Sequence, residues 1–589
     1  MKADATPLLA IFEKKMRLEV PLFQRQYVWN KEQQWEPLWE DISRKFAEYL
    51  EGRKDAPVHF LGAMVLDQKQ TPTTHVEKRQ VIDGQQRLTT LQIFIAAFRD
   101  FCRVQNAEDL AKECDAFTVN KGMMAEPDVD KFKVWPTQLD RVQFTDVIIS
   151  NSRAELENRH PLTHRKYARK PEPRPRMVDA YLFFYEQIEE FFNGDTADEP
   201  LAGEVPLPER LEECFQALKN ALQVVVIDLD RDDDAQVIFE TLNARGEPLL
   251  PADLLRNFIF LRAARRGEPQ ESLYNDYWRR FDDQFWRVEV KQGRLLRPRS
   301  DLFMQHFLSS RQTVDIPIKH LFVEYKFWIE RQKPFATVRE ELATLSRQGD
   351  DFRRIIEPKV GDPIQPLAVF LDSFDVRTCY PLLLALLDAN IDEGEWKKIG
   401  VSLESYILRR AVCGLTTKNY NRTFLYLTRN LRRDGLTHQN LVKQLSEQTG
   451  DSAEWPTDET FAEAWRTRHV YQTFNNPKVI HIFKCLNTTY LGSKHELISF
   501  DGPLTVEHLL PQNWVEHWPL PDGSKGLTVT ELWNAAPDDV RTIASQRRYA
   551  ALQTFGNLTI LTQAPKFGCF QQCLVREEAR VNAALTSSD

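Results

Sequence analysis

The sequence predicts a multidomain α+β protein with a large, mostly helical middle. Its 589 residues are too many for one hydrophobic core. The first hundred residues combine short apolar runs with helical spacing, and helical spacing of Leu, Phe, Tyr and Trp dominates from about residue 260 to 450. Two strand-like runs return near the C-terminus. We therefore expect domains at residues 1–230, 231–450 and 451–589.

Composition narrows the class of protein. Apolar residues make up 42% and charged residues 28% of the chain, as in soluble globular proteins. A net charge of −9 argues against a generally basic nucleic-acid coat but leaves room for a local basic groove. The eight cysteines form no C-x-x-C pair, and neither a signal peptide nor an apolar run of about 20 residues is present. We expect a cytoplasmic protein with reduced thiols and without a structural zinc or a membrane segment.

The first hundred residues predict a compact α+β unit. The segment Val20–Asn30 mixes strand formers with aromatic residues, and Lys31–Leu50 has the apolar spacing of a helix. A buried strand is expected at His59–Leu66. From Leu88, apolar residues recur at three-and-four spacing, which predicts a helix with one buried face.

The run Arg79–Leu91 is the most informative stretch. An apolar strand breaks at Asp83-Gly84 and restarts at once as a helix, which places polar and cationic groups at a helix N-terminus. Exposed backbone N–H groups, the helix dipole and the fork of Arg87 would together favour a phosphate there. The alternative is an ordinary strand-turn-helix corner.

The centre of the chain begins with a basic segment. Residues 159–176 hold seven Lys or Arg, one acid and four Pro, which favours a solvated linker over a DNA-contacting loop. A strand is expected at Ala221–Asp230, a helix at Asp234–Leu242 and a turn at Asn243–Leu249. Pro251 suits the first turn of a further helix that runs through Phe260.

Two strands near the C-terminus could form a metal site. One lies within Leu504–Gln512 and carries Glu507-His508, and Phe555–Thr562 looks like a turn and a second strand. A His beside a carboxylate, followed by Gly-Asn before a second strand, fits a strand-strand-helix nuclease of the HNH kind. There the His is the general base on water, while the acid and a later helix residue hold one divalent cation. The alternative is a structural Glu-His pair.

Several motifs together resemble one family. They are Phe23-Gln24-Arg25-x-Tyr27-x-Trp29, Phe60-x-Gly62, Ile82 to Thr90, Phe239 to Gly246 with Ala252-Asp253-Leu254, and Glu507-His508-x-x-Pro511 with Gly556-Asn557-Leu558-Thr559. They occur in the family's order and cover nearly the whole chain. The sequence resembles GmrSD-type modification-dependent (type IV) restriction enzymes.

The resemblance implies an N-terminal ParB/sulfiredoxin-like domain that binds or hydrolyses a nucleoside triphosphate and takes part in sensing DNA. The residues that carry this role are Asp83, Gly84, Gln85, Gln86 and Arg87, with Gln24, Arg25 and Tyr27 as neighbours. Arg25 and Arg87 can neutralise the charge of a phosphate, and the Gln amides can orient water or bind the edge of a base. Asp83 can hold Mg²⁺ or cap the helix. Asn243, Arg245 and Asp253 match a motif for which a structural turn is favoured over catalysis.

For the C-terminal part, the resemblance implies an HNH endonuclease that cuts phage DNA in antiviral defence. Its site residues are His508 as general base, Glu507 as metal ligand and Asn557. The implied cofactors are Mg²⁺ or Mn²⁺ and one of GTP, UTP, ATP or CTP. The implied partner is double-stranded phage DNA with a modification such as glucosylated hydroxymethylcytosine or phosphorothioate. A homodimer is an open alternative, since one HNH site cuts one strand.

The C-terminus departs from the family pattern. Family members carry a further Asn, an aromatic residue and Glu-Lys after the second strand, whereas this chain reads Lys566 to Glu578 without the helix Asn. One permitted set of codons for this segment, read one base later, restores the pattern. We hypothesise a single-base frame slip near Pro565, which gene sequencing decides. Because a missing ligand weakens metal binding, we expect reduced or absent cleavage by this polypeptide, with nucleotide binding intact.

Two rival functions remain open at this point. One is a nucleotide-dependent DNA-binding switch whose HNH domain is inactive. The other is a ParB-like regulatory protein without a nuclease, against which the Glu507-His508 and Gly556-Asn557 motifs argue. Metal-dependent cleavage of DNA separates both from a restriction enzyme.

Overall fold

The computed structural model of the chain describes residues 2–21, 23–69, 71–72, 75–163, 171–193, 205–230, 233, 250–292, 294–490 and 502–561. The chain divides into two compact units. The first comprises residues 1–283 and 325–342, and the second comprises residues 284–324 and 343–589. The three domain ranges expected from the sequence stay a prediction.

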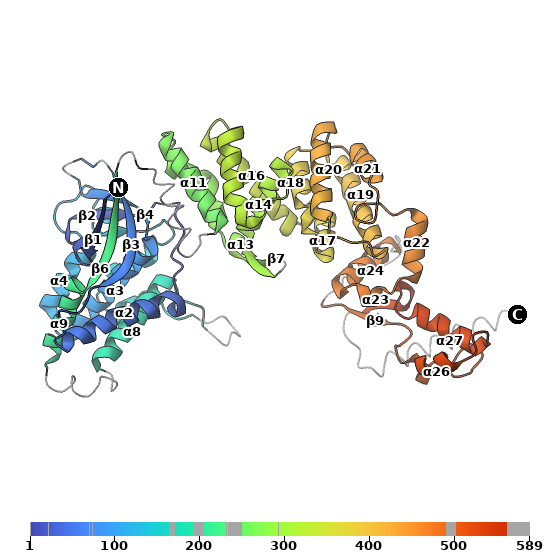
Figure 1. Cartoon of the computed structure of the whole chain (residues 1–589), viewed down its shortest axis with the longest axis horizontal. Helices are drawn as coiled ribbons and strands as arrows, with labels where there is room; N and C mark the ends of the chain where they lie inside the picture. The colour runs from blue at the N-terminus through green and yellow to red at the C-terminus, as the bar shows by residue number, and fades with distance from the viewer. Residues whose placement is uncertain are drawn as a thin grey trace. The chain divides into compact units, whose positions relative to one another are not determined.

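The first unit is built around a mixed six-stranded sheet in the order β1-β6-β3-β4-β2-β5 (Figure 1). Its strands are β1 (Lys2–Pro7), β2 (Met16–Glu19), β3 (His59–Gln68), β4 (Glu77–Asp83), β5 (Val134–Trp135) and β6 (Leu222–Leu229). The pairs β1-β6 and β3-β4 are antiparallel, and the pairs β3-β6, β2-β4 and β2-β5 are parallel. Parallel neighbours need long crossover connections, so strands far apart in the sequence meet at the centre of the sheet.

Helix α3 (Gln85–Val104) is the central helix of this unit. Its expected apolar face is buried, and so are Ile93, Phe94 and Phe101 on its other sides. It packs against α4 (Glu108–Thr118) and α8 (Arg176–Asn193), and all three share one large core with the sheet. A helix that is buried all round is fixed by its neighbours. The N-terminus of α3 is therefore held in place.

The remaining helices of the first unit are shorter or lie at its periphery. They are α1 (Ala10–Glu13), η1 (Lys31–Trp35), α2 (Glu36–Leu50), α5 (Pro127–Asp130), α6 (Arg141–Ile149), α7 (Arg153–Arg159), α9 (Leu207–Asn220), α11 (Pro251–Arg265), α12 (Gln270–Leu273), η2 (Tyr274–Trp278), η3 (Arg279–Asp282) and η5 (Trp328–Gln332).

The two faces of the sheet are covered unequally. Met64 of β3 and Val81 of β4 face the large helical core, whereas the next residues, Val65 and Ile82, belong to a small second cluster. Leu254 of α11 packs against that second cluster. Because strand side chains alternate between faces, both faces at the end of β4 are occupied. This explains why β3 reads as a continuous apolar run rather than an alternating one.

The second unit is mostly helical. Its elements before residue 500 are α13 (Gln284–Arg287), β7 (Glu289–Gln292), β8 (Leu295–Pro298), α14 (Arg299–Gln312), η4 (Ile318–His320), α15 (Leu321–Phe327), α16 (Val338–Ile356), α17 (Gln365–Phe374), η6 (Arg377–Cys379), α18 (Tyr380–Asp388), α19 (Glu393–Val412), α20 (Tyr420–Asp434), α21 (His438–Ser446), α22 (Asp458–Thr467), α23 (Val470–Thr473) and α24 (Asn476–Tyr490); α15 and α16 extend into residues 325–342 of the first unit. This confirms the expected helical middle.

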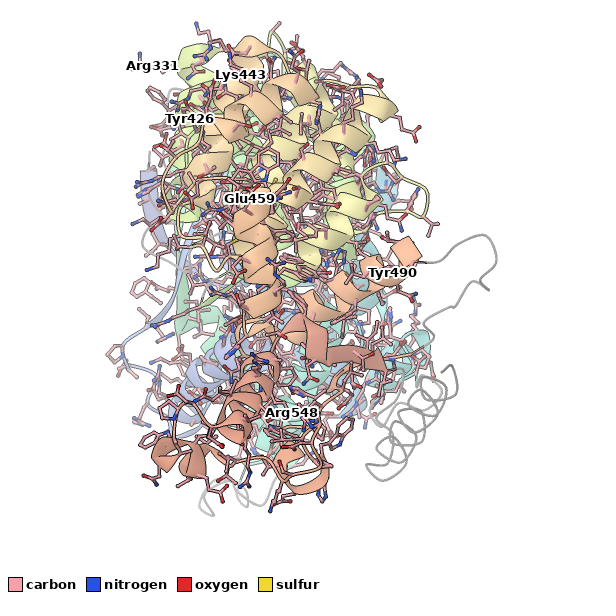
Figure 2. All side chains as sticks on the ribbon, turned by 90° about the vertical axis from the view of Figure 1, so that its right-hand side faces the viewer. Arg331, Tyr426, Lys443, Glu459, Tyr490 and Arg548 are labelled. Atoms are coloured by element: carbon pink, nitrogen blue, oxygen red, sulfur yellow. The ribbon has the colours of Figure 1, made fainter. Side chains whose placement is uncertain are left out.

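The end of the second unit holds a two-stranded sheet and short helices. They are β9 (Thr505–His508), α25 (Trp514–His517), α26 (Val529–Asn534), α27 (Val540–Ala551), η7 (Phe555–Asn557) and β10 (Leu558–Leu561). A small core around Trp514 joins α25 to α27. From α27, Arg548 (Figure 2) donates hydrogen bonds to the carbonyl oxygens of Trp518 and Pro519, at 2.7 and 2.9 Å. These contacts fix the loop that follows α25.

Most expected elements are confirmed. The described part of Val20–Asn30 contains no strand; the strand lies just before it, at Met16–Glu19. The loop bonds to side chains at the start of α3 instead of a strand, which the residue types alone do not reveal. The expected helix at Asp234–Leu242 lies outside the described residues. Within the described part of the chain, no helix has the length and apolar character needed to span a membrane.

Candidate nucleotide site and candidate nuclease site

The turn between β4 and α3 depends on Gly84. This residue is the N-cap of α3 and has φ +88°, a conformation that favours glycine. A Cβ at this position would lie 3.0 Å from Met64 Cγ and 3.1 Å from the carbonyl oxygen of Ala63. The cap makes no side-chain hydrogen bond. Capping by Asp83, one of its two expected roles, is therefore wrong, because Gly84 occupies the cap position.

Glutamine side chains bind the loop of residues 23–29 to this corner. Gln86 donates from Nε2 to the carbonyl oxygen of Gln26 at 3.0 Å and accepts at Oε1 from the amide of Val28 at 2.8 Å. Gln85 donates from Nε2 to the carbonyl oxygen of Arg25 at 3.0 Å. Gln24 donates back to the carbonyl oxygen of Ile82 at 3.2 Å. These amide N–H groups are engaged with main chain, so their first role is to join the two motifs.

Arg87 is held from the neighbouring strand. Its Nη1 donates to the carbonyl oxygen of Ala63 at 2.6 Å. Gly62 leaves the room for this guanidinium, because a Cβ there would lie 2.6 Å from Arg87 Cζ. Burial lowers the pKa of Arg87, and the charge of Asp83 partly offsets the shift. The glycine at position 62 is thus explained by the arginine that the strand must accommodate.

Tyr27 belongs to a buried polar chain. Its hydroxyl lies 2.7 Å from Thr90 Oγ1 and accepts a hydrogen bond from Trp35 Nε1 at 2.9 Å. Its backbone amide donates to Asp140 Oδ2 at 2.9 Å. Burial raises the pKa of Tyr27 well above its usual value. The residue therefore anchors the loop in the core and does not present its hydroxyl to a ligand.

Some groups at the corner keep their bonding capacity. Within the described part of the chain, the guanidinium of Arg25 makes no recorded hydrogen bond or ion pair, and buried Gln85 Oε1 lacks a partner. The first amides of α3 have no intrahelical acceptor, as at every helix start. Asp83 faces both Arg25 and Arg87 electrostatically, yet burial is the larger influence and raises its pKa. The two cations and the orphan amides can hold a phosphate group, whereas the carboxylate of Asp83 opposes it when ionised.

The second candidate site lies on β9 and β10. The strands pair antiparallel, with His508 opposite Leu558 and Glu507 opposite Thr559. Because neighbouring strand residues point to opposite faces, β9 itself does not bring Glu507 and His508 to one point. Both side chains are partly exposed. The motif is therefore placed at the surface rather than in a core.

His508 has two partners that the sequence did not indicate. Its Nε2 lies 3.2 Å from Gln553 Oε1, and its ring stands edge-on to Tyr471 with centroids 4.3 Å apart. An amide oxygen accepts a hydrogen bond, so Nε2 carries the proton in this arrangement. The basic nitrogen is then Nδ1. Gln553 lies a few residues before the Gly-Asn motif, but nothing in its sequence context marks it.

Asn557 is engaged on every side by main chain. Its Oδ1 accepts from the amide of Leu510 at 2.7 Å, and its Nδ2 donates to the carbonyl oxygens of Leu510 and Leu552 at 3.0 and 2.8 Å. These bonds fix the loop after His508 against the start of β10. The catalytic role expected for Asn557 stays a prediction, and its contacts are those of a positioning residue.

The described residues do not complete a metal site. Among them, no group of three or more His, Cys, Asp or Glu side chains gathers so that it could hold a metal ion. The further ligand implied by the resemblance, and the frame-slip segment after Pro565, lie outside the described residues. Asn243 and Arg245 also lie outside them, whereas Asp253 pairs with Arg256 at 2.9 Å, as a structural residue would.

Comparison with protein families decides the affiliation. The family model described as GmrSD restriction endonuclease, N-terminal domain, matches residues 8–260, and the model for the C-terminal domain of GmrSD restriction endonucleases matches residues 455–565. The chain belongs to the GmrSD restriction endonuclease family. The first match contains the α3 corner and the second contains β9 and β10. No curated protein matches the chain.

Proposed function

We propose that this restriction endonuclease cuts modified double-stranded phage DNA and is regulated by a nucleoside triphosphate at the start of α3. The observation that carries the nucleotide part is the guanidinium of Arg25, which acts electrostatically on Asp83 just before α3 and makes no recorded hydrogen bond or ion pair among the described residues. Phosphate binding at a helix start with an arginine fork is favourable for both charge and geometry. The corner reads phosphates, so GTP, UTP, ATP and CTP remain equal candidates, and hydrolysis is part of the proposal.

The proposed chemistry at β9 is activation of water by His508. Gln553 Oε1 lies 3.2 Å from Nε2 and accepts its hydrogen bond, so Nδ1 is the nitrogen that takes a proton from water. Asn557 keeps the following loop in place through Leu510. Glu507 supplies a carboxylate that suits Mg²⁺ or Mn²⁺. Modification of the target by glucosylated hydroxymethylcytosine or phosphorothioate is likewise part of the proposal.

Digestion of modified and unmodified phage DNA tests the proposal. The chain as given and a frame-corrected version are each incubated with Mg²⁺ or Mn²⁺ and with each nucleoside triphosphate in turn. We expect the frame-corrected chain to cut only modified DNA and only with nucleotide and metal. We expect little or no cleavage by the chain as given. Equal cleavage of unmodified DNA without nucleotide contradicts the proposal.

Two arginine variants test the nucleotide part of the proposal separately from the nuclease part. Arg25→Ala is expected to weaken triphosphate binding roughly tenfold or more, in line with the loss of one charge-assisted hydrogen bond. Arg331 (Figure 2) is exposed and makes no recorded hydrogen bond or ion pair within the described ranges, so Arg331→Ala is the matched control. Equal binding by both variants contradicts a nucleotide site at the corner. No cleavage by the frame-corrected chain under any condition favours the DNA-binding switch instead.

A further inference from the structure

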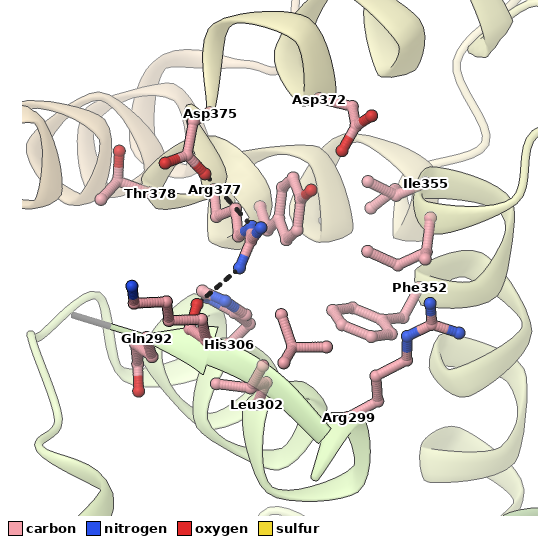
Figure 3. Close-up of a pocket in the computed structure, with 14 residues that line it drawn as sticks. Gln292, Arg299, Leu302, His306, Phe352, Ile355, Asp372, Asp375, Arg377 and Thr378 are labelled. Atoms are coloured by element: carbon pink, nitrogen blue, oxygen red, sulfur yellow. Dashed lines mark hydrogen bonds and ion pairs between the residues drawn. The ribbon is translucent and has the colours of Figure 1, made fainter. Parts of the chain in front are cut away.

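A cavity of about 370 Å³ lies in the helical part of the second unit, between the two segments that the family models match. It is enclosed by β7, α14, the end of α16, and the turn from α17 to α18 (Figure 3). Ligand pockets in proteins start at about 300 Å³. The cavity is therefore large enough for a mononucleotide and too small for a double helix.

One wall of the cavity is a cluster of three aromatic rings. His306 lies with its ring centroid 5.3 Å from that of Tyr380 and 6.3 Å from that of Phe352, and the latter two are 6.0 Å apart. Phe352 and Tyr380 are buried, while His306 is partly exposed. Leu302 and Ile355 extend the apolar lining. Such a wall suits a planar ring, which gains from stacking and from apolar burial.

His306 adds polar capacity that the fold does not use. No hydrogen bond of its imidazole is recorded within the described part of the chain. Burial, together with the charge of Arg377, lowers the pKa of His306 to about 4. The ring is therefore neutral near pH 7 and offers one donor and one acceptor nitrogen. A heteroaromatic ring edge can satisfy both.

Charged side chains of both signs also line the cavity. Arg377 reaches across the opening (Figure 3), donates from Nη1 to the carbonyl oxygen of Lys291 at 2.9 Å, and lies 3.5 Å from Asp375. The ammonium of Lys291 is exposed and makes no recorded bond within the described ranges. Arg299 lies on the same lining. Asp372 and Asp375 line the same cavity, and Arg299 pairs with Glu357 at 3.4 Å, so within the described ranges the ammonium of Lys291 is the lining cation without a recorded carboxylate partner and suits the phosphate of a nucleotide.

We propose that this cavity binds a single nucleotide, with its base against His306, Phe352 and Tyr380 and its phosphate near Lys291 and Arg377. The nucleotide comes either free from solution or as a unit turned out of a DNA strand, since a base inside a duplex cannot enter a cavity of this size. This site is separate from the α3 corner. The inference stands on its own observations and does not require the proposed triphosphate regulation.

Calorimetric titration of the full chain tests the inference. The probes are UMP, GMP, AMP and CMP, each alone, and a short single-stranded DNA oligonucleotide. Lys291→Gln removes an exposed charge without touching the core, and His306→Phe keeps the ring packing but deletes both nitrogens. We expect each variant to weaken binding roughly tenfold, the effect of losing one polar contact to the ligand. Lys319→Gln, an exposed lysine of the same unit, is the matched control and should bind like the parent chain.

The outcomes separate the sources and the two sites. Binding of a monophosphate that depends on Lys291 and His306 supports a free nucleotide, and binding of the oligonucleotide alone supports a nucleotide turned out of DNA. The inference is overturned if no probe binds, or if Lys291→Gln and His306→Phe both behave like Lys319→Gln. It is also overturned if Arg25→Ala removes all binding, because the α3 corner would then be the site. Loss of all binding in Arg25→Ala would still be consistent with the proposed regulation by a triphosphate at the α3 corner.

Discussion

The corner before α3 and the strand β9 differ in how their motif side chains are bonded. At the corner, the side chains of Gln24, Gln85 and Gln86 donate hydrogen bonds to main-chain oxygens. At the end of β9, the side chains of Glu507 and His508 are partly exposed. Both regions were singled out by equally dense motifs. In the first, most motif residues hold a loop and a strand together, and among the described residues Arg25, the oxygen of the Gln85 amide and the first backbone amides of α3 keep bonding capacity. At β9, the side chain of Asn557 makes the hydrogen bonds that fix the loop after His508. A dense motif therefore mixes residues that build a site with residues that act in it.

The largest expected effect is on chemistry at β9. In the frame-corrected chain, His508→Ala should lower the rate of DNA cleavage about a thousandfold, within the range for loss of a general base. Cleavage kinetics on modified plasmid DNA measure this. His517 is exposed, with one 3.7 Å contact to its neighbour Glu516, so His517→Ala is the control. A rate within threefold of the parent would mean that β9 is architectural, like the corner.

The next largest effect is on the architecture of the corner. Gly62→Ala should lower the free energy of unfolding of the first unit by about 3 kcal/mol, because the new Cβ meets the Arg87 guanidinium and φ is +108°. Gly52→Ala is the matched control, since φ is +77° there but nothing lies within 4 Å of the Cβ. Chemical denaturation measures both. Equal losses would show that the backbone conformation alone matters and that Arg87 is free to move.

Removing the two hydrogen bonds of the Gln86 side chain should lower the free energy of unfolding by less than Gly62→Ala does. Gln86→Leu deletes the bonds to Gln26 and Val28 and leaves main-chain groups of the loop unpaired, which predicts a loss of about 2 kcal/mol in unfolding free energy. Hydrogen exchange of the amide of Val28 should speed up in this variant. A loss below about 0.5 kcal/mol would contradict the view that this residue joins the two motifs.

A smaller effect is expected from the residue that orients His508. Gln553→Ala removes the acceptor at Nε2 and should slow cleavage by the frame-corrected chain roughly tenfold, as for loss of one orienting hydrogen bond. Gln553→Glu keeps an acceptor oxygen and should retain more activity than the alanine variant. The two rates, compared over a range of pH, measure this. Identical rates for both variants would leave Tyr471 as the partner that matters.

The smallest effect concerns the buried charge at the corner. The pKa of Asp83 is raised, chiefly by burial. The carboxyl is protonated in both states below its unfolded pKa, so it costs no stability there. As the pH rises through the raised folded pKa the cost becomes complete. Asp83→Asn should therefore raise the melting temperature slightly at pH 7 and not at pH 3. A lower melting temperature at pH 7 would show that the pairs with Arg25 and Arg87 outweigh burial.

Elements controlled by local residue patterns could be predicted from the sequence. Helical spacing of apolar residues predicts α2 and α3, and apolar runs predict β3 and β6. Pro251 predicts the start of α11. The order of the motifs also indicated the family, which the family models confirm. The sequence did not place β2, since Met16–Glu19 is too short to stand out and is a strand only through its pairing with β4.

The partners of each motif side chain depend on the tertiary structure. Gln85 and Gln86 read as free amides in the sequence, and only the packing of the loop against α3 engages them. The partners of His508, namely Gln553 and Tyr471, come from distant segments, and the aromatic wall around His306 joins three helices. Such contacts depend on how helices and strands meet in space. Local residue patterns carry no information about that, because chain segments far apart in sequence are brought together only by folding.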